Sequence, residues 1–200
     1  MPVKAGRRFE TLFLVNIILV GMPGSGKTTL GRLLSRRLGM PFADVDHAIE
    51  ERLGCSVREY FDRAGEQAFR DLEQQTVDEL TRRPAGVIST GGGSVLRPVN
   101  RQMLRERGRV FYLRASPEDL YRRLRHDTTR PLLQVADPMA RLRSLFKERD
   151  ALYREAAHHV LDTNRPSVSH LLGRIMMQLE QDACMPPQAP AAPAANPTGA

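Results

Sequence analysis

The sequence predicts an α/β fold in which a parallel five-stranded sheet carries helices on both faces. Three observations support this prediction. Short apolar runs alternate with amphipathic stretches along most of the chain, as in strand–helix–strand units. The first run, residues 12–20, is apolar almost throughout, as expected for a strand that is covered on both faces. A length of 200 residues with 41% hydrophobic content suits one domain with a full core.

The individual elements follow from local patterns. In residues 27–38 apolar side chains recur at helical spacing, and Gly39 is a typical residue for a helix end. Ser116, Pro117 and Glu118 provide an N-cap, a first helical residue and a first-turn acid for a helix that begins there. The other predicted helices cover residues 46–53, 57–61, 64–82, 138–157 and 167–181. The other predicted strands cover residues 41–45, 87–90, 110–113 and 159–162.

Several segments lack such patterns. Residues 126–138 show no periodicity and are expected to form a long loop. Residues 1–10 are polar and basic, and we expect a flexible arm there. Residues 183–200 are expected to be a disordered tail, because residues 185–200 contain five prolines, six alanines and no charge. A single folded domain is therefore expected over residues 11–182.

The positive charge of the chain comes almost entirely from arginine. The formal net charge is +7, and of the 30 basic residues only Lys4, Lys27 and Lys147 are lysines. This balance is compatible with nucleic acid, an acidic membrane surface or small anionic substrates as partners. The arginines are spread along the whole chain, and only 6% of the residues are aromatic. This distribution favours small anionic substrates over nucleic acid.

Cysteine usage and the N-terminal sequence fit a protein of the reducing cytoplasm. Cys55 and Cys184 are far apart and have no Cys or His neighbours at metal-ligand spacing, so neither a disulfide framework nor a zinc site is expected. Arg7-Arg8 before the first apolar run resembles an export signal. However, the run is too short to span a bilayer, contains Asn16 and leads into a glycine-rich loop. We interpret it as a buried strand and expect no membrane partner.

The glycine-rich loop matches the phosphate-binding P-loop pattern at every fixed position. Residues 21–28 read GMPGSGKT, an apolar run precedes them and an amphipathic helix follows, as the motif requires. The glycines allow consecutive backbone N–H groups to converge on phosphate oxygens at the N-terminus of the helix. Lys27 is placed to reach the β- and γ-phosphates, and Thr28 to hold Mg²⁺ through its hydroxyl. Besides Lys27 and Thr28, the predicted nucleotide-binding residues of this loop are Gly24, Ser25, Gly26 and Thr29.

A P-loop identifies the phosphate donor but not the acceptor, because GTPases, motor ATPases and several kinds of kinase share it. Asp44 and Asp46, two apart at the end of the second predicted strand, are expected to lie on the same face of the chain beside the phosphates. Four later motifs follow in order. They are GEQAFRDLE at residues 65–73, TGGG at 90–93, TRPLL at 129–133 and ERDALY at 148–153.

The series formed by the two aspartates and these four motifs closely resembles shikimate kinase over roughly residues 16–180. The resemblance implies a three-layer P-loop kinase fold, with substrate-binding helices over residues 46–82 and a lid over residues 124–138. It also implies that ATP and shikimate are the substrates and that the γ-phosphate moves to the 3-hydroxyl of shikimate, a step of aromatic amino-acid biosynthesis. One Mg²⁺ ion and a monomeric enzyme are expected.

The resemblance also implies roles for individual residues. Asp44 would complete the Mg²⁺ shell opposite Thr28, and Asp46 would accept a hydrogen bond from the attacking hydroxyl as general base. Lys27, Asp46 and Arg130 would be the catalytic residues, with Arg130 reaching the transferring phosphate from the lid.

The remaining roles concern substrate and nucleotide contacts. Arg70 and Arg149 would bind the shikimate carboxylate, because their planar forks match two carboxylate oxygens. Glu73, one helical turn after Arg70, would hold its guanidinium in place. The triple glycine would offer backbone N–H groups to shikimate at Gly92 and Gly93, although a flexible turn is the alternative for this segment. Arg123 and Arg165 resemble residues that flank the adenine.

Two other functions are compatible with parts of the pattern. A gluconate-type kinase shares the P-loop sheet and phosphorylates another hydroxy acid, but the motif series follows the shikimate pattern. An ATP-sensing regulator or nucleic-acid binder would explain the net charge, but it would not require the full set of candidate catalytic groups.

Overall fold

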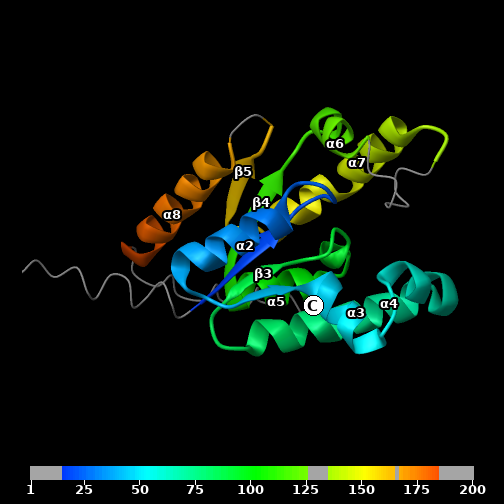
Figure 1. Ribbon diagram of the computed structural model, residues 1–200, viewed down its shortest axis with the longest axis horizontal. Helices are drawn as coiled ribbons and strands as arrows, with labels where there is room; N and C mark the ends of the chain where they lie inside the picture. The colour runs from blue at the N-terminus through cyan, green and yellow to red at the C-terminus, as the bar shows by residue number, and fades with distance from the viewer. Residues whose placement is uncertain (1–14, 126–134, 165–166, 185–200) are drawn as a thin grey trace, which may run out of the picture.

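The computed structural model describes residues 15–125, 135–164 and 167–184. Its centre is a five-stranded sheet with the strand order β2-β3-β1-β4-β5, and every neighbouring pair runs parallel (Figure 1). The strands are β1 (Asn16–Val20), β2 (Phe42–Asp44), β3 (Val87–Ser89), β4 (Gly108–Arg114) and β5 (His159–Asp162). The predicted parallel five-stranded sheet is confirmed.

Helices cover both faces of the sheet (Figure 1). The helices are α2 (Lys27–Leu38), α3 (Val45–Leu53), α4 (Val57–Arg82), α5 (Pro98–Arg107), α6 (Pro117–Leu124), α7 (Pro138–Ala156) and α8 (Val168–Cys184), with a short 3-10 helix η1 (Ser94–Leu96). Side chains of β1 alternate between two hydrophobic clusters. Ile17 and Leu19 pack with α2 and α8, whereas Ile18 and Val20 pack with α4, α5 and α7. All four are fully buried, so a central strand without polar alternation is explained by cover on both faces.

Asn16 is the one polar residue of β1, and its side chain is buried with its hydrogen bonds made. Its amide nitrogen donates to the Thr81 carbonyl over 3.0 Å, and its oxygen accepts from the Gly86 N–H, also over 3.0 Å. These contacts join the start of the central strand to the last turn of α4 and to the α4–β3 connection, so Asn16 links three segments at this end of the sheet.

The structure differs from the sequence predictions at several elements. The two predicted helices 57–61 and 64–82 are present within α4 as two helices joined at a kink, but the break lies at Gly65, whose φ of 80° and ψ of 173° are not helical. No helix was predicted for residues 94–107, where η1 and α5 lie. The last helix continues to Cys184, so the expected start of a disordered tail at residue 183 is wrong for residues 183 and 184.

Several further predictions concern residues outside the described ranges. These are the arm at 1–10, the part of the first apolar run before residue 15, most of the lid, and the tail from residue 185. Within the described residues, no helix has both the length and the apolar character needed to cross a membrane.

The topology brings two loops and the start of a helix to the same edge of the sheet. The P-loop follows β1, α3 follows β2 without a gap, and the triple glycine follows β3. Because these strands are parallel neighbours, their carboxyl ends lie side by side.

Candidate active site

The P-loop has the backbone conformation that its glycines predict. Gly21, Gly24 and Gly26 have φ angles of 148°, 79° and 95°, a region that other residues rarely adopt. Gly26 is the N-cap of α2, so the N-terminus of this helix faces the space above the loop. Lys27 arches back over the loop, and its Nζ donates to the carbonyls of Gly21 and Met22 at 2.9 and 3.0 Å.

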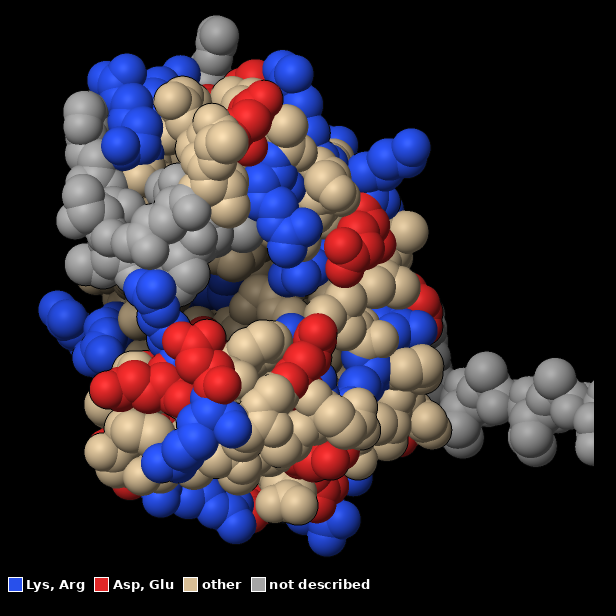
Figure 2. Space-filling view, turned by 90° about the vertical axis from the view of Figure 1, so that its right-hand side faces the viewer, with Lys and Arg blue, Asp and Glu red and all other residues tan. Residues whose placement is uncertain are grey.

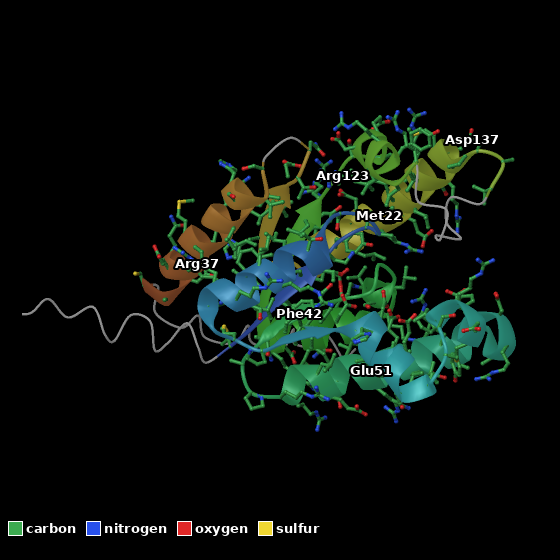
Figure 3. The ribbon with its side chains drawn as sticks, in the orientation of Figure 1. Met22, Arg37, Phe42, Glu51, Arg123 and Asp137 are labelled. Atoms are coloured by element: carbon green, nitrogen blue, oxygen red, sulfur yellow. The ribbon has the colours of Figure 1, made fainter. Side chains whose placement is uncertain are left out.

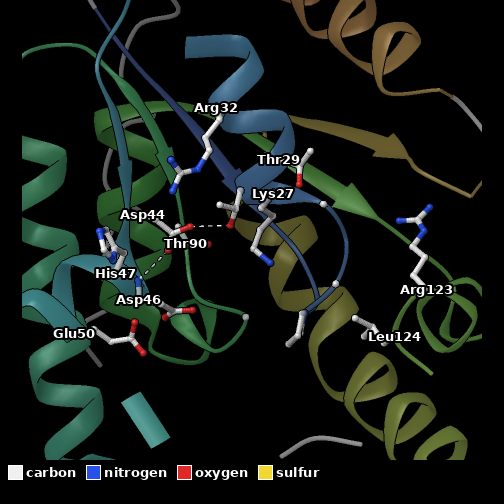
Figure 4. A pocket seen from close by; sticks show the side chains of 15 residues that line it. Lys27, Thr29, Arg32, Asp44, Asp46, His47, Glu50, Thr90, Arg123 and Leu124 are labelled. Atoms are coloured by element: carbon white, nitrogen blue, oxygen red, sulfur yellow. Dashed lines mark hydrogen bonds between the residues drawn. The ribbon is translucent and has the colours of Figure 1, made fainter. Parts of the chain in front are cut away.

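Thr28 and Asp44 are in direct contact across the loop. The Thr28 hydroxyl donates to Asp44 Oδ2 over 2.8 Å (Figure 4). Asp44 Oδ1 accepts from the Asp46 N–H and thereby caps α3. A hydroxyl and a carboxylate joined in this way provide the hard oxygen ligands that Mg²⁺ prefers. The described residues contain no cluster of three or more His, Cys, Asp or Glu side chains suited to a metal, so any Mg²⁺ here would rely on phosphate and water for its other ligands.

The two aspartates are not placed as a strand would place them. Asp44 is the last residue of β2, but Asp46 lies in the first turn of α3. The prediction that they share one face of an extended strand is therefore wrong. Both aspartates still line the same cavity, because α3 begins directly after β2 at the edge of the sheet.

Asp46 has the properties of a general base. Burial, together with the nearby carboxylates of Asp44 and Glu73, raises its pKa from 3.8 to about 6. Lys27 acts in the opposite direction but does not cancel these effects. A carboxylate whose pKa lies about one unit below neutral pH is ionised in the cell and is basic enough to accept a proton from a hydroxyl in the transition state.

The triple glycine is closely packed by neighbouring groups, and its backbone angles are ordinary. None of Gly91, Gly92 and Gly93 has a positive φ. A Cβ at Gly91 would lie 2.6 Å from Asp46 Oδ1, one at Gly92 would lie 2.7 Å from Pro23 Cδ, and one at Gly93 would collide with the Arg70 guanidinium. The alternative of a flexible turn is therefore not supported.

Arg70 and Arg149 approach this loop from different helices. Arg70 Nη1 donates to Glu73 Oε2 over 2.6 Å, as predicted, and the Glu73 side chain is only 1% exposed. The other Glu73 oxygen accepts from the Ser94 hydroxyl over 2.7 Å. Arg149 Nη1 donates to the Gly92 carbonyl over 3.2 Å. Both arginines are thus fixed beside the triple glycine, although neither lines the cavity itself.

A cavity of about 570 Å³ lies between these groups, and Figure 2 shows the hollow on this face of the molecule. Of the predicted site residues, it is lined by Gly24, Gly26, Lys27, Thr28, Thr29, Asp44, Asp46, Gly92 and Arg123. The lining residues without a predicted role are Pro23, Arg32, His47, Glu50, Thr90 and Leu124 (Figure 4). Arg32 also lies over the Phe42 ring, with its guanidinium carbon 5.2 Å from the ring centroid. Pro23 and Thr90 lie inside the P-loop and TGGG motifs, and Leu124 lies at the start of the predicted lid, but none of the three had a predicted role. Arg32, His47 and Glu50 lie outside the motifs, although Glu50 follows Asp46 by one helical turn.

A second cavity of about 320 Å³ adjoins the first, and Gly24, Gly26, Thr29 and Arg123 line both. Its walls include Val168 and Leu171, and the Arg123 guanidinium donates to the Thr163 carbonyl.

Ser25 lines this second cavity as well, and its buried hydroxyl has no hydrogen-bond partner among the described residues. Arg123 on α6 and Glu51 on α3 lie on opposite sides of the P-loop that holds Met22 (Figure 3). In the close-up, Asp46 and Arg123 lie on opposite sides of Lys27 (Figure 4). Asp46 does not line the second cavity, and the apolar wall of that cavity suits a planar base.

Two predicted site residues, Arg130 and Arg165, lie outside the described residues. Their positions relative to the cavities stay predictions from the sequence.

Comparisons with known proteins agree with this geometry. A family model described as shikimate kinase matches residues 23–180. A shikimate kinase of Paracidovorax citrulli is 57% identical over 176 residues, which cover 86% of this chain and 96% of that protein.

Solved structures give the same result. A shikimate kinase from Acinetobacter baumannii, determined in complex with shikimate, superposes with a TM-score of 0.83 and 41% identity, covering 88% of this chain and 99% of that chain. A gluconokinase from Sinorhizobium meliloti shares the fold, with a TM-score of 0.56 over 86% of this chain and 94% of that chain, but is only 18% identical. The chain therefore belongs to the shikimate kinase family.

Proposed function

We propose that this protein transfers the γ-phosphate of ATP to the 3-hydroxyl of shikimate, giving shikimate 3-phosphate and ADP. The observation that carries the proposal is the position of Asp46. This carboxylate, with its raised pKa, lines the same cavity as Lys27 and Thr28 of the P-loop and lies against the triple glycine that Arg70 and Arg149 flank. A base, a phosphate-binding loop and two arginines suited to a carboxylate are thereby within one site.

The donor half of the site would bind ATP across both cavities. The phosphates would lie on the backbone N–H groups of the P-loop at the N-terminus of α2, with Lys27 turning from the loop carbonyls to the β- and γ-phosphates. The base would enter the second cavity beside Arg123, Val168 and Leu171. Arg165 is proposed to flank the base as well.

Mg²⁺ would be held by Thr28, directly through its hydroxyl, and by Asp44. When bound, the ion neutralises negative charge that develops on the phosphate oxygens. The structural support is the 2.8 Å contact that already holds these two side chains together.

In the acceptor half, Asp46 would accept the proton of the attacking hydroxyl. Arg70 would bind the shikimate carboxylate while Glu73 fixes its orientation, and Arg149 would bind it from the other side of the triple glycine. The N–H groups of Gly92 and Gly93 are proposed as further donors to shikimate. No hydrogen bond within the described part of the chain uses either N–H as its donor.

The lid, residues 124–138, is proposed to close over the site and to deliver Arg130 to the transferring phosphate. We further propose that residues 46–82 form the substrate-binding region of a single domain, that the protein acts as a monomer in the cytoplasm, and that nucleic acid is not a partner.

The decisive experiment is a coupled ADP-release assay with ATP and Mg²⁺ in which shikimate, gluconate or no acceptor is supplied. We expect release that depends on both shikimate and Mg²⁺. Equal turnover with gluconate would refute shikimate as the specific acceptor and leave the kinase assignment standing. Turnover without acceptor would indicate an ATPase. Filter binding to DNA or RNA at several salt concentrations tests the absence of a nucleic-acid partner.

A further inference from the structure

Tyr153, on α7, belongs to the ERDALY motif but has no role in the site as described so far. Its side chain is fully buried, and its hydroxyl donates to the Gly92 carbonyl over 2.6 Å. Arg149, one helical turn earlier, donates to the same carbonyl over 3.2 Å. One carbonyl oxygen of the triple glycine therefore accepts two hydrogen bonds from α7, and the shorter one comes from the tyrosine.

We propose that Tyr153 is a positioning residue for the acceptor substrate, because it sets the orientation of the Gly92–Gly93 peptide. This inference rests on the proposed shikimate site. In a trans peptide the C=O and the following N–H point in opposite directions, and the described chain contains no cis peptide bond. A hydrogen bond that holds the Gly92 carbonyl toward α7 therefore directs the Gly93 N–H away from α7.

Shikimate is expected between Arg149 of α7 and the groups that contact the loop from other elements, Asp46 of α3 and Arg70 of α4. A Cβ at Gly91 would meet Asp46 Oδ1, and one at Gly93 would meet the Arg70 guanidinium. In this proposal the Gly93 N–H, directed away from α7, faces the region between the proposed base and Arg70. Without the Tyr153 hydrogen bond this peptide plane would be held less firmly, since glycine offers little resistance to rotation and the contact to Arg149 is the longer one.

Tyr153 is itself held rigidly. Its ring stacks on that of Tyr112, with centroids 4.9 Å apart and planes inclined by 26°. The Tyr112 hydroxyl donates to Asp150 Oδ1 over 2.8 Å. This arrangement matters because Arg149 is expected to turn its donors to the shikimate carboxylate, which leaves Tyr153 as the permanent partner of the Gly92 carbonyl.

The test is Tyr153→Phe, which keeps the stacked ring and removes only the hydroxyl. The matched control is Tyr112→Phe, which removes a hydroxyl from the other ring of the same stack. We expect Tyr153→Phe to raise the KM for shikimate by about three- to thirtyfold, the equivalent of one or two neutral hydrogen bonds. The KM for ATP and kcat should stay within about twofold, because the lost interaction serves substrate binding. Tyr112→Phe should leave all three constants near wild type.

A second measurement separates positioning from loosening of the core. In ¹H–¹⁵N spectra, the Gly93 amide should shift on addition of shikimate to the wild type and to Tyr112→Phe, and shift much less in Tyr153→Phe at saturating shikimate. The inference is overturned if Tyr153→Phe keeps the wild-type KM and the wild-type Gly93 shift, or if both variants raise the KM equally together with a fall in melting temperature. Failure of the proposed function itself would appear differently, as a wild-type protein without shikimate-dependent turnover.

Discussion

Replacing Asp46 with asparagine should remove catalysis and at the same time make the folded protein more stable. The carboxylate lies where its charge is unfavourable, since burial and the carboxylates of Asp44 and Glu73 raise its pKa. Asparagine has nearly the same shape and no charge. The ionised carboxylate therefore lowers the stability of the folded protein, and the site keeps it because catalysis needs a base. Asparagine at this position removes the destabilising charge together with the base.

The magnitude follows from the pKa of Asp46 in the two states. The pKa is about 6 in the folded protein and 3.8 in the unfolded reference, a difference of about two units. Each unit corresponds to about 1.4 kcal/mol, which gives an upper value of about 3 kcal/mol. Because the side chain retains some contact with solvent, we expect about 1 to 3 kcal/mol. For a chain of 200 residues this corresponds to a rise in melting temperature of roughly 2 to 10 °C.

The sign of the pH dependence is specific. Below about pH 4 the carboxyl is protonated in both states and contributes nothing. Between about pH 4 and 6 the unfolded state is ionised while the folded state still holds the proton, so wild-type stability falls as the pH rises. Above about pH 6 the cost is constant. The stabilisation by Asp46→Asn should therefore be full at pH 8 and nearly absent at pH 4.

Thermal or urea unfolding of wild type and Asp46→Asn between pH 4 and 8 measures this difference. Asp62→Asn, at an exposed carboxylate of α4, is the control and should show little effect at any pH. The same raised pKa predicts that wild-type kcat/KM for shikimate falls below about pH 6, as the base becomes protonated. A variant that is equally stable or less stable than wild type at pH 8, or stabilised equally at both ends of the range, would refute the reasoning.

The remaining predictions concern the other parts of the site and the chain end. Arg70→Lys and Arg149→Lys should each weaken shikimate binding by about 1 to 3 kcal/mol in calorimetric titration with little change for ATP, and an unchanged affinity in both would remove them from the site. Gly93→Ala should raise the KM for shikimate by about tenfold or more in steady-state assays, because its methyl group would occupy the place of the Arg70 guanidinium; wild-type kinetics would contradict this. Arg130→Ala should lower kcat by roughly a hundredfold or more with a much smaller change in KM, and near-wild-type kcat at saturating ATP would leave the lid without a catalytic residue. Truncation after Cys184 should leave activity and melting temperature nearly unchanged, and a large fall would show that the tail docks.

The last of these boundaries illustrates how the structure changed an expectation. The sequence pattern placed the end of the last helix at residue 181, but Asp182 pairs with His159 of β5 over 2.9 Å and with Arg109 of β4 over 3.5 Å. A truncation after Gln181 would remove these contacts. Nothing local in the sequence indicates them, because the partners are separated by 23 and 73 residues.

The sequence by itself determined the features that depend on local chemistry. Apolar runs and helical spacing predicted the parallel sheet and most helices, and the glycines of the P-loop predicted a backbone that only glycine adopts readily. The helical spacing of Arg70 and Glu73 likewise predicted their contact. These features need only neighbours along the chain.

The tertiary structure alone decided the features that depend on groups brought together from distant elements. The raised pKa of Asp46 depends on burial, on the carboxylate of Asp44 and on that of Glu73 from another helix. The position of Asp46 depends on α3 beginning at the sheet edge, where strand alternation no longer applies. The triple glycine is closely packed because Pro23, Asp46 and Arg70 approach it from three other segments. Packing of this kind leaves no periodic signal in the sequence. Each contact joins single residues of two segments, and the number of residues between the two segments follows no rule.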